Sequence, residues 1–154
     1  MKDSIRIKPH HFVDIITEYG AGELSCEPSP SGHALHLVAA QILRNRDVLL
    51  VVELGADDIC EPCKHNINGL CDDTIDTSYR PQAPTSKREY NLLLDQRWCR
   101  RLSIKQGDEL TARHFCERLR ELAQDITDIY QEEPLDLTAD RARNVNQGVK
   151  RFLE

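Results

Sequence analysis

Two short apolar runs near the start of the chain predict β-strands. Ile5 and Ile7 alternate with charged residues, which is the two-residue period of a half-buried strand, and Pro9 ends this run. Residues 48–52 form an uninterrupted apolar run, a pattern typical of a strand buried on both faces. Because helical patterns lie between the two runs, we expect the strands to form a small parallel βαβ core.

Apolar residues recur at helical spacing through most of the remaining chain. The stretches expected to be helical are residues 11–19, a segment starting at 33, and residues 90–102, 111–130 and 139–153. Loops are expected at residues 25–32 and 56–84, where this spacing is missing. The sequence therefore predicts a mainly helical α/β fold, with a small parallel βαβ core followed by C-terminal helices.

A chain of 154 residues suits one domain. Within it we expect a metal-binding loop at residues 56–75 and a helical C-terminal part at residues 87–154. A domain of this size buries enough surface to fold without a metal or disulfides, so a metal site here need not be structural.

The charge balance narrows the classes of partner. With 20 Lys and Arg against 26 Asp and Glu, the formal net charge is −6, whereas binding to a nucleic-acid backbone needs a concentrated basic surface. The longest apolar run is too short to span a bilayer, and the N-terminus lacks the apolar segment of an export signal. We therefore expect a cytoplasmic protein that binds neither nucleic acid nor membranes and keeps its cysteines reduced.

Three of the six cysteines lie close together in the second loop. Cys60 and Cys63 form a Cys-x-x-Cys pair, and Cys71 follows after an Asn-Gly turn. Two thiolates at this spacing can bind one metal centre, and the turn allows the third to converge on it. In a reduced chain such a cluster indicates an iron–sulfur cluster or a zinc ion.

Two other interpretations of these cysteines stay open. They can be ordinary buried thiols, although their neighbours are acidic, basic and amide residues rather than aliphatic ones. The strand followed by Cys-Glu-Pro-Cys also superficially resembles the active-site segment of thioredoxin, which would make Cys60 and Cys63 a thiol–disulfide pair. The Asn-Gly segment after Cys63 would break the helix that this chemistry requires, and the acidic Asp57 and Asp58 oppose thiolate formation.

Several segments of the chain resemble a family of small uncharacterised bacterial and archaeal proteins described as predicted iron–sulfur binders. The segments are residues 5–11 (Ile-Arg-Ile-Lys-Pro-His-His), the Asp-Asp-Ile-Cys-x-x-Cys segment at 57–63, Gly69-Leu70-Cys71 and Leu94-Asp95. The resemblance extends over residues 5–120, with diverged sequence between the motifs.

The pattern of this family has His-His-x-x-Cys near the N-terminus, then Cys-x-x-Cys and a further Cys, which are the four thiolates of a cubane cluster. In this chain Asp14 stands where the family has its first cysteine. The resemblance implies an iron–sulfur cluster at Cys60, Cys63 and Cys71 with a changed fourth ligand. The candidates for that ligand are His10, His11, Asp14, His65, Cys26, Cys99 and water.

Other polar residues have simpler expectations. Three thiolates with one His or Asp also form the closed tetrahedral set of a zinc ion, so zinc stays an alternative to the cluster. The acidic residues of the second loop, Asp57, Asp58, Asp72 and Asp73, are expected to be solvated. The two histidines of the second predicted helix, His33 and His36, are expected on its polar surface.

These alternatives lead to different functions. An iron–sulfur cluster predicts a redox or sensing protein that works with a protein or redox partner, and zinc predicts a metal-stabilised interaction module. A reactive Cys60–Cys63 pair predicts a thiol–disulfide oxidoreductase. A metal position left open to substrate would make the protein an enzyme, but no pattern in the sequence selects a substrate.

Overall fold

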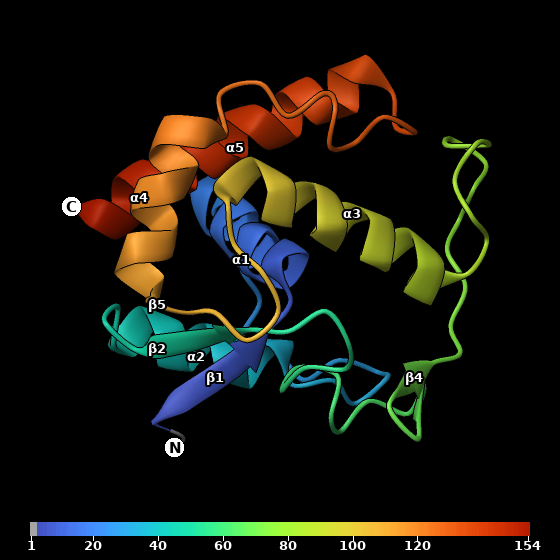
Figure 1. Cartoon of the computed structure of the whole chain (residues 1–154), viewed down its shortest axis with the longest axis horizontal. Helices are drawn as coiled ribbons and strands as arrows, with labels where there is room; N and C mark the ends of the chain where they lie inside the picture. Colours follow the sequence, from blue (N-terminus) through green and yellow to red (C-terminus); the bar gives the residue numbers. More distant parts are fainter. Residues whose placement is uncertain (1–2) are drawn as a thin grey trace.

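A computed structural model describes residues 3–154 of the chain (Figure 1). The helices are α1 (Pro9–Ala21), α2 (Leu35–Arg44), α3 (Lys87–Leu102), α4 (Ala112–Leu122) and α5 (Leu135–Leu153). The strands are β1 (Ser4–Ile7), β2 (Leu49–Val52), β3 (Asn66–Ile67), β4 (Leu70–Cys71) and β5 (Glu109–Thr111). The predicted mainly helical α/β class is confirmed.

A small mixed sheet carries the predicted parallel pair. Strand β1 runs parallel to β2, with Ile5 opposite Leu50 and Ile7 opposite Val52. The segment between them contains α1 and α2, which completes the βαβ unit. The structure adds β5 antiparallel to β2 on its other edge, a strand too short for the sequence pattern to reveal. Leu49 and Val51 are only half-buried, so β2 is fully buried on one face and not on both as predicted.

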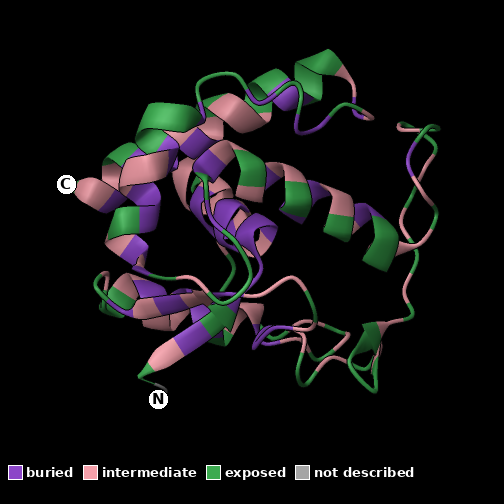
Figure 2. Cartoon of the chain, viewed as in Figure 1, coloured by how far each residue is buried: buried purple, intermediate pink, exposed green. Residues whose placement is uncertain are grey.

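Helix α1 forms the centre of the molecule. Figure 1 shows it between the sheet and the helices α3, α4 and α5, and Figure 2 shows that its N-terminal half is largely buried and the rest partly buried. Its Phe12 ring packs against Phe115 of α4 and Phe152 of α5, with ring centroids 4.3 and 6.4 Å apart. The aliphatic and aromatic core therefore fixes the start of α1 relative to the ends of β1 and β2.

The helix predicted at residues 111–130 is shorter than expected. Helix α4 ends at Leu122, and the chain then turns, because the carboxylate of Asp125 accepts hydrogen bonds from the backbone N–H and the hydroxyl of Thr127. Ile126 and Ile129 are still buried, so turns rather than helix carry these apolar residues into the core. Periodicity alone cannot separate the two cases.

The loop that contains the cysteines includes two very short strands. Within the predicted loop, β3 and β4 form a minimal hairpin around Asn68 and Gly69, both with positive φ. Among the residues that the structure describes, no helix combines the length and apolar composition needed to cross a membrane.

Candidate metal centre

A cavity of about 620 Å³ lies where β1 and β2 end and α1 begins. The carboxyl ends of parallel strands are a common place for ligand sites in α/β folds. All six residues predicted as metal ligands line this one cavity: His10, His11, Asp14, Cys60, Cys63 and Cys71. The structure thus brings the predicted ligands together from α1, the loop after β2 and the β3–β4 hairpin.

Asp57 ties these segments to one another. Its carboxylate is completely buried, and its Oδ2 accepts hydrogen bonds from the backbone N–H of Lys8 and from Nδ1 of His11, both at 2.7 Å. Its Oδ1 accepts from the backbone N–H groups of Ile59 (3.1 Å) and Cys60 (3.0 Å). Burial alone would raise the pKa of Asp57, but the adjacent His11 and these hydrogen bonds hold it well below its ordinary value.

The prediction that Asp57 and Asp58 lie in a solvated acidic loop is wrong. Both are buried, because residues 57 and 58 pair with the β1–α1 junction. Arg6 donates its backbone N–H to Asp58 Oδ2 (2.9 Å), and the Asp58 N–H donates to the Arg6 carbonyl (3.0 Å). Hydrogen bonds to β1 therefore hold the start of the loop after β2 against the fold, and this part of the loop is buried.

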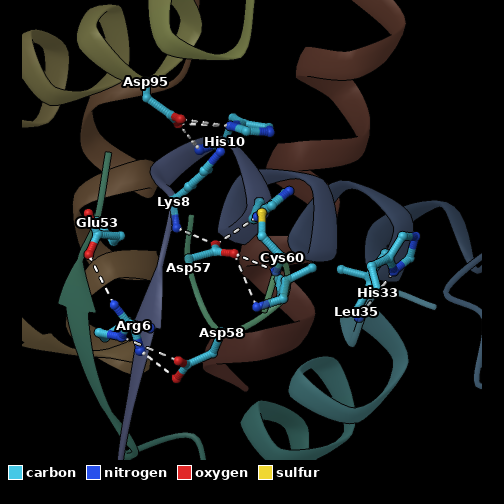
Figure 3. Close-up of polar contacts among 12 residues, drawn as sticks. Arg6, Lys8, His10, His33, Leu35, Glu53, Asp57, Asp58, Cys60 and Asp95 are labelled. Atoms are coloured by element: carbon cyan, nitrogen blue, oxygen red, sulfur yellow. Dashed lines mark hydrogen bonds and ion pairs between the residues drawn. The ribbon is translucent and has the colours of Figure 1, made fainter. Parts of the chain in front are cut away.

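His10 has a carboxylate partner of its own. Asp95 of α3 is completely buried and accepts hydrogen bonds from the His10 backbone N–H (2.7 Å) and from its ring Nδ1 (2.9 Å), as Figure 3 shows. Burial would lower the pKa of His10, but the negative charge of Asp95 and this hydrogen bond raise it overall. The His10 and His11 rings lie against each other, with centroids 4.3 Å apart.

The two carboxylates give both imidazoles the same hydrogen-bond arrangement, with Nδ1 facing a carboxylate. An Nδ1–H donated to a carboxylate leaves Nε2 without a proton in the neutral ring, and that atom is then free to bind a metal. This Nδ1-to-carboxylate arrangement is the one that supports metal-ligating histidines in proteins. Both His10 and His11 therefore have the support of metal ligands.

Cys60 brings a thiol to the same place. Among residues 3–154, His11, Asp57 and Cys60 are the one group of three metal-binding side chains whose ligand atoms all lie within 4.8 Å of one another. Both oxygens of Asp57 already accept two hydrogen bonds each, so its chemistry here is to orient His11 and the Cys60 backbone. His11 and Cys60 remain as the donors for a metal.

The Cys60 thiol is poorly suited to ionise by itself. Burial and the negative charge of Asp57 raise its pKa to about 12. A thiolate at this position therefore needs a positive partner such as a bound metal ion.

The other predicted ligands lie in the cavity wall but outside the His11–Asp57–Cys60 group. Cys63 follows Cys60 in a turn closed by a hydrogen bond from its N–H to the Cys60 carbonyl (2.9 Å), and Cys71 is in β4. Asp14 lies one turn along α1 from His10, 3.4 Å from Arg141. Of the alternative fourth ligands, His65 lines the cavity, whereas Cys26 and Cys99 do not.

Sequence reasoning missed two groups of this site. His33 was expected on a polar surface but lines the cavity. Asp95 was not recognised as a partner of His10, although a signal was present: it is a carboxylate on the apolar face of α3, next to Leu94 and near Trp98, and all three are buried. A charged residue in such a stripe must have a buried partner.

Comparisons with known proteins place no further constraint on the site. Neither the protein-family models, nor the curated proteins, nor the solved structures contain a significant match to this chain.

Proposed function

We propose that this protein holds a metal centre in the cavity at the start of α1, with His11 and Cys60 among its ligands. The observation that carries the proposal is the His11–Asp57–Cys60 group, in which ligand atoms lie within 4.8 Å and a fully buried carboxylate orients the imidazole. Imidazole and thiolate together suit zinc and iron rather than magnesium or calcium.

The finer proposal is an iron–sulfur cluster bound by Cys60, Cys63 and Cys71, with His11 as the fourth ligand. Three thiolates on a single zinc ion would lie about 3.8 Å apart, since each Zn–S bond is about 2.3 Å and the angles are tetrahedral. Cys60, Cys63 and Cys71 line the same cavity, but they do not form a group whose sulfur atoms all lie within 4.8 Å of one another. A cluster, which binds each thiolate to a different iron atom, suits this wider spacing, and histidine is an accepted cluster ligand.

A zinc ion is the second candidate, and a different observation favours it. His10 and His11 each donate Nδ1 to a buried carboxylate, which is the usual support of zinc-bound imidazole. A zinc ion bound by both histidines and Cys60 would keep one position open toward the cavity. A structural zinc site is closed, so an open cavity of about 620 Å³ beside the metal supports a role in binding or catalysis.

The thiol–disulfide alternative has less support. A nucleophilic cysteine in such enzymes has a lowered pKa, whereas burial and Asp57 raise the pKa of Cys60 to about 12. Reduction of insulin disulfides by the metal-free protein, lost in Cys60→Ser, would restore this alternative.

Metal analysis of protein purified without oxygen tests the centre. We expect brown protein with iron and sulfide in the wild type, and an absorption band near about 400 nm that dithionite bleaches, the region of sulfur-to-iron charge transfer. Cys60→Ser should lose the metal, and His11→Ala should weaken binding. Colourless protein with one zinc per chain supports the second candidate, and protein with neither metal contradicts the proposal.

The chain offers a matched control for these variants. Cys26 is exposed and lies outside the cavity, so Cys26→Ser should keep the full metal content. Equal loss of metal in Cys26→Ser and Cys60→Ser would mean that the metal binds nonspecifically to thiols, which also contradicts the proposed centre.

A further inference from the structure

Lys8 is an unusual member of the cavity wall. It precedes α1 directly and is only 7% exposed, although its side chain ends in an ammonium group. Figure 3 shows it between Asp57 and His10. Lysine is almost never buried to this extent unless its ammonium group has a partner.

No such partner lies within the described part of the chain. The Lys8 backbone is fully used, since its N–H donates to Asp57 and its carbonyl accepts from the N–H groups of His11 and Phe12. Its ammonium group, however, forms no hydrogen bond or ion pair with any of residues 3–154. The donors of this ammonium group are therefore free to bind a ligand in the cavity that Lys8 lines.

The buried carboxylates Asp57 and Asp95 bind other donors and not the Lys8 ammonium group. Asp57 already accepts hydrogen bonds from two backbone groups of its own loop, from Lys8 N–H and from His11. Asp95 accepts from the backbone and the ring of His10. A ligand in the cavity can supply the acceptor that these two carboxylates do not provide.

Of the other cations in the cavity wall, Arg88 is exposed to solvent and three have carboxylate partners. Arg80 and Arg141 both contact the buried Glu133, at 3.4 and 3.3 Å, and Lys87 contacts Asp73 at 3.4 Å. Lys8 is the buried cation of the wall that lacks such a pair among the described residues.

The Lys8 ammonium also lies beside the proposed metal ligands. Lys8 lines the same cavity as His10, His11 and Cys60. A group bound to the Lys8 ammonium would therefore lie in the cavity that these ligands line.

We propose that Lys8 forms an oxyanion-binding subsite, which holds a carboxylate or phosphate group of a small-molecule ligand next to His10, His11 and Cys60. The role of this subsite in metal-dependent chemistry rests on the function proposed above, whereas the anion site itself rests on Lys8. The ligand class is a small anionic metabolite that fits a cavity of about 620 Å³.

Calorimetric titration with inorganic phosphate tests the subsite, using the full chain prepared without oxygen and with its metal measured. We expect phosphate to bind the wild type, and Lys8→Met to weaken that binding by roughly ten- to a hundredfold, as expected for loss of a charged hydrogen-bond donor. Lys87→Met is the matched control and should bind phosphate as the wild type does, because Lys87 is already paired with Asp73. Equal affinity of Lys8→Met and the wild type, or no phosphate binding at millimolar concentration, overturns the proposal.

A second measurement tests the subsite in the wild-type protein, so it does not depend on the folding of a variant. Reductive methylation followed by mass spectrometry should label Lys8 slowly in the free protein, and saturating phosphate should protect Lys8 but not Lys87. Unchanged labelling of Lys8 overturns the subsite. Phosphate binding that depends on Lys8 in protein without any metal keeps the subsite and rejects the metal centre, so the two proposals fail separately.

Discussion

Replacing Gly148 with alanine is expected to lower the free energy of unfolding by about 3 kcal/mol, although alanine is the better helix former. Gly148 lies in α5 where this helix crosses α1, and a Cβ atom there would overlap the backbone carbonyl of Ile16. It would also lie 2.9 Å from the Ile16 Cγ2 atom. The overlap is with backbone, so the two helices must move apart and lose core packing.

Thermal and urea unfolding of the two proteins measure this effect, which corresponds to a fall in Tm of roughly 6–12 °C for a chain of this size. Gln147 is exposed on the same helix, so Gln147→Ala should change the stability by less than about 0.5 kcal/mol.

Gly20→Ala should lower the stability as much as Gly148→Ala does, since a Cβ at Gly20 would overlap the Asn144 carbonyl at the same crossing. The double variant should cost less than the two effects added, because either change already separates the helices. A stabilised Gly148→Ala would show that the helices do not approach so closely.

The predictable part of this fold is the part with strong local patterns. The parallel strands near Ile5 and Leu50 and the amphipathic helices have periodicities that tertiary contacts then reinforce. Strand β5 has only three residues and exists because β2 has a free edge beside it, which no local pattern encodes. The close crossing of α1 and α5 is equally hidden, because Gly20 appears in the sequence only as a helix-ending residue.

In the site, too, some features could be predicted from the sequence and others could not. The cysteine spacing and the His-His pair indicate a metal centre, and the cavity does contain His11, Cys60, Cys63 and Cys71. Their supporting groups were not predictable, because Asp57 in a polar loop has the local sequence of a solvated residue. Its burial depends on residues 6–8, which are distant in the chain and meet it only after the strands have paired.

Asp57 should therefore be important both for the fold and for the metal centre. We expect Asp57→Ala to cost about 3–5 kcal/mol, because it removes a buried carboxylate that accepts four hydrogen bonds. The loss leaves the backbone N–H groups of Lys8, Ile59 and Cys60 without their acceptor, and it releases the ring of His11. Urea unfolding in the presence of a chelator measures the effect on the fold alone.

The pH dependence gives a second test of the same carboxylate. Because folding lowers the pKa of Asp57, its ionisation stabilises the protein at neutral pH, above its unfolded value of about 3.9. This contribution is lost progressively as the pH falls below that value. The stability difference between the wild type and Asp57→Asn should therefore be largest near neutral pH and shrink below about pH 4.

A surface pair of the same chemistry is the control. Asp72 accepts a hydrogen bond from His65 Nδ1 at 2.9 Å, but its side chain is 57% exposed. Asp72→Ala should cost less than about 1 kcal/mol, since exposed pairs contribute little. In metal titrations Asp57→Asn should weaken binding by roughly ten- to a hundredfold, as for other groups that orient a metal-bound imidazole, while Asp72→Ala should not. An Asp57→Asn protein that is destabilised but binds metal normally would mean that Asp57 supports the fold only, and that His11 is not oriented for a metal.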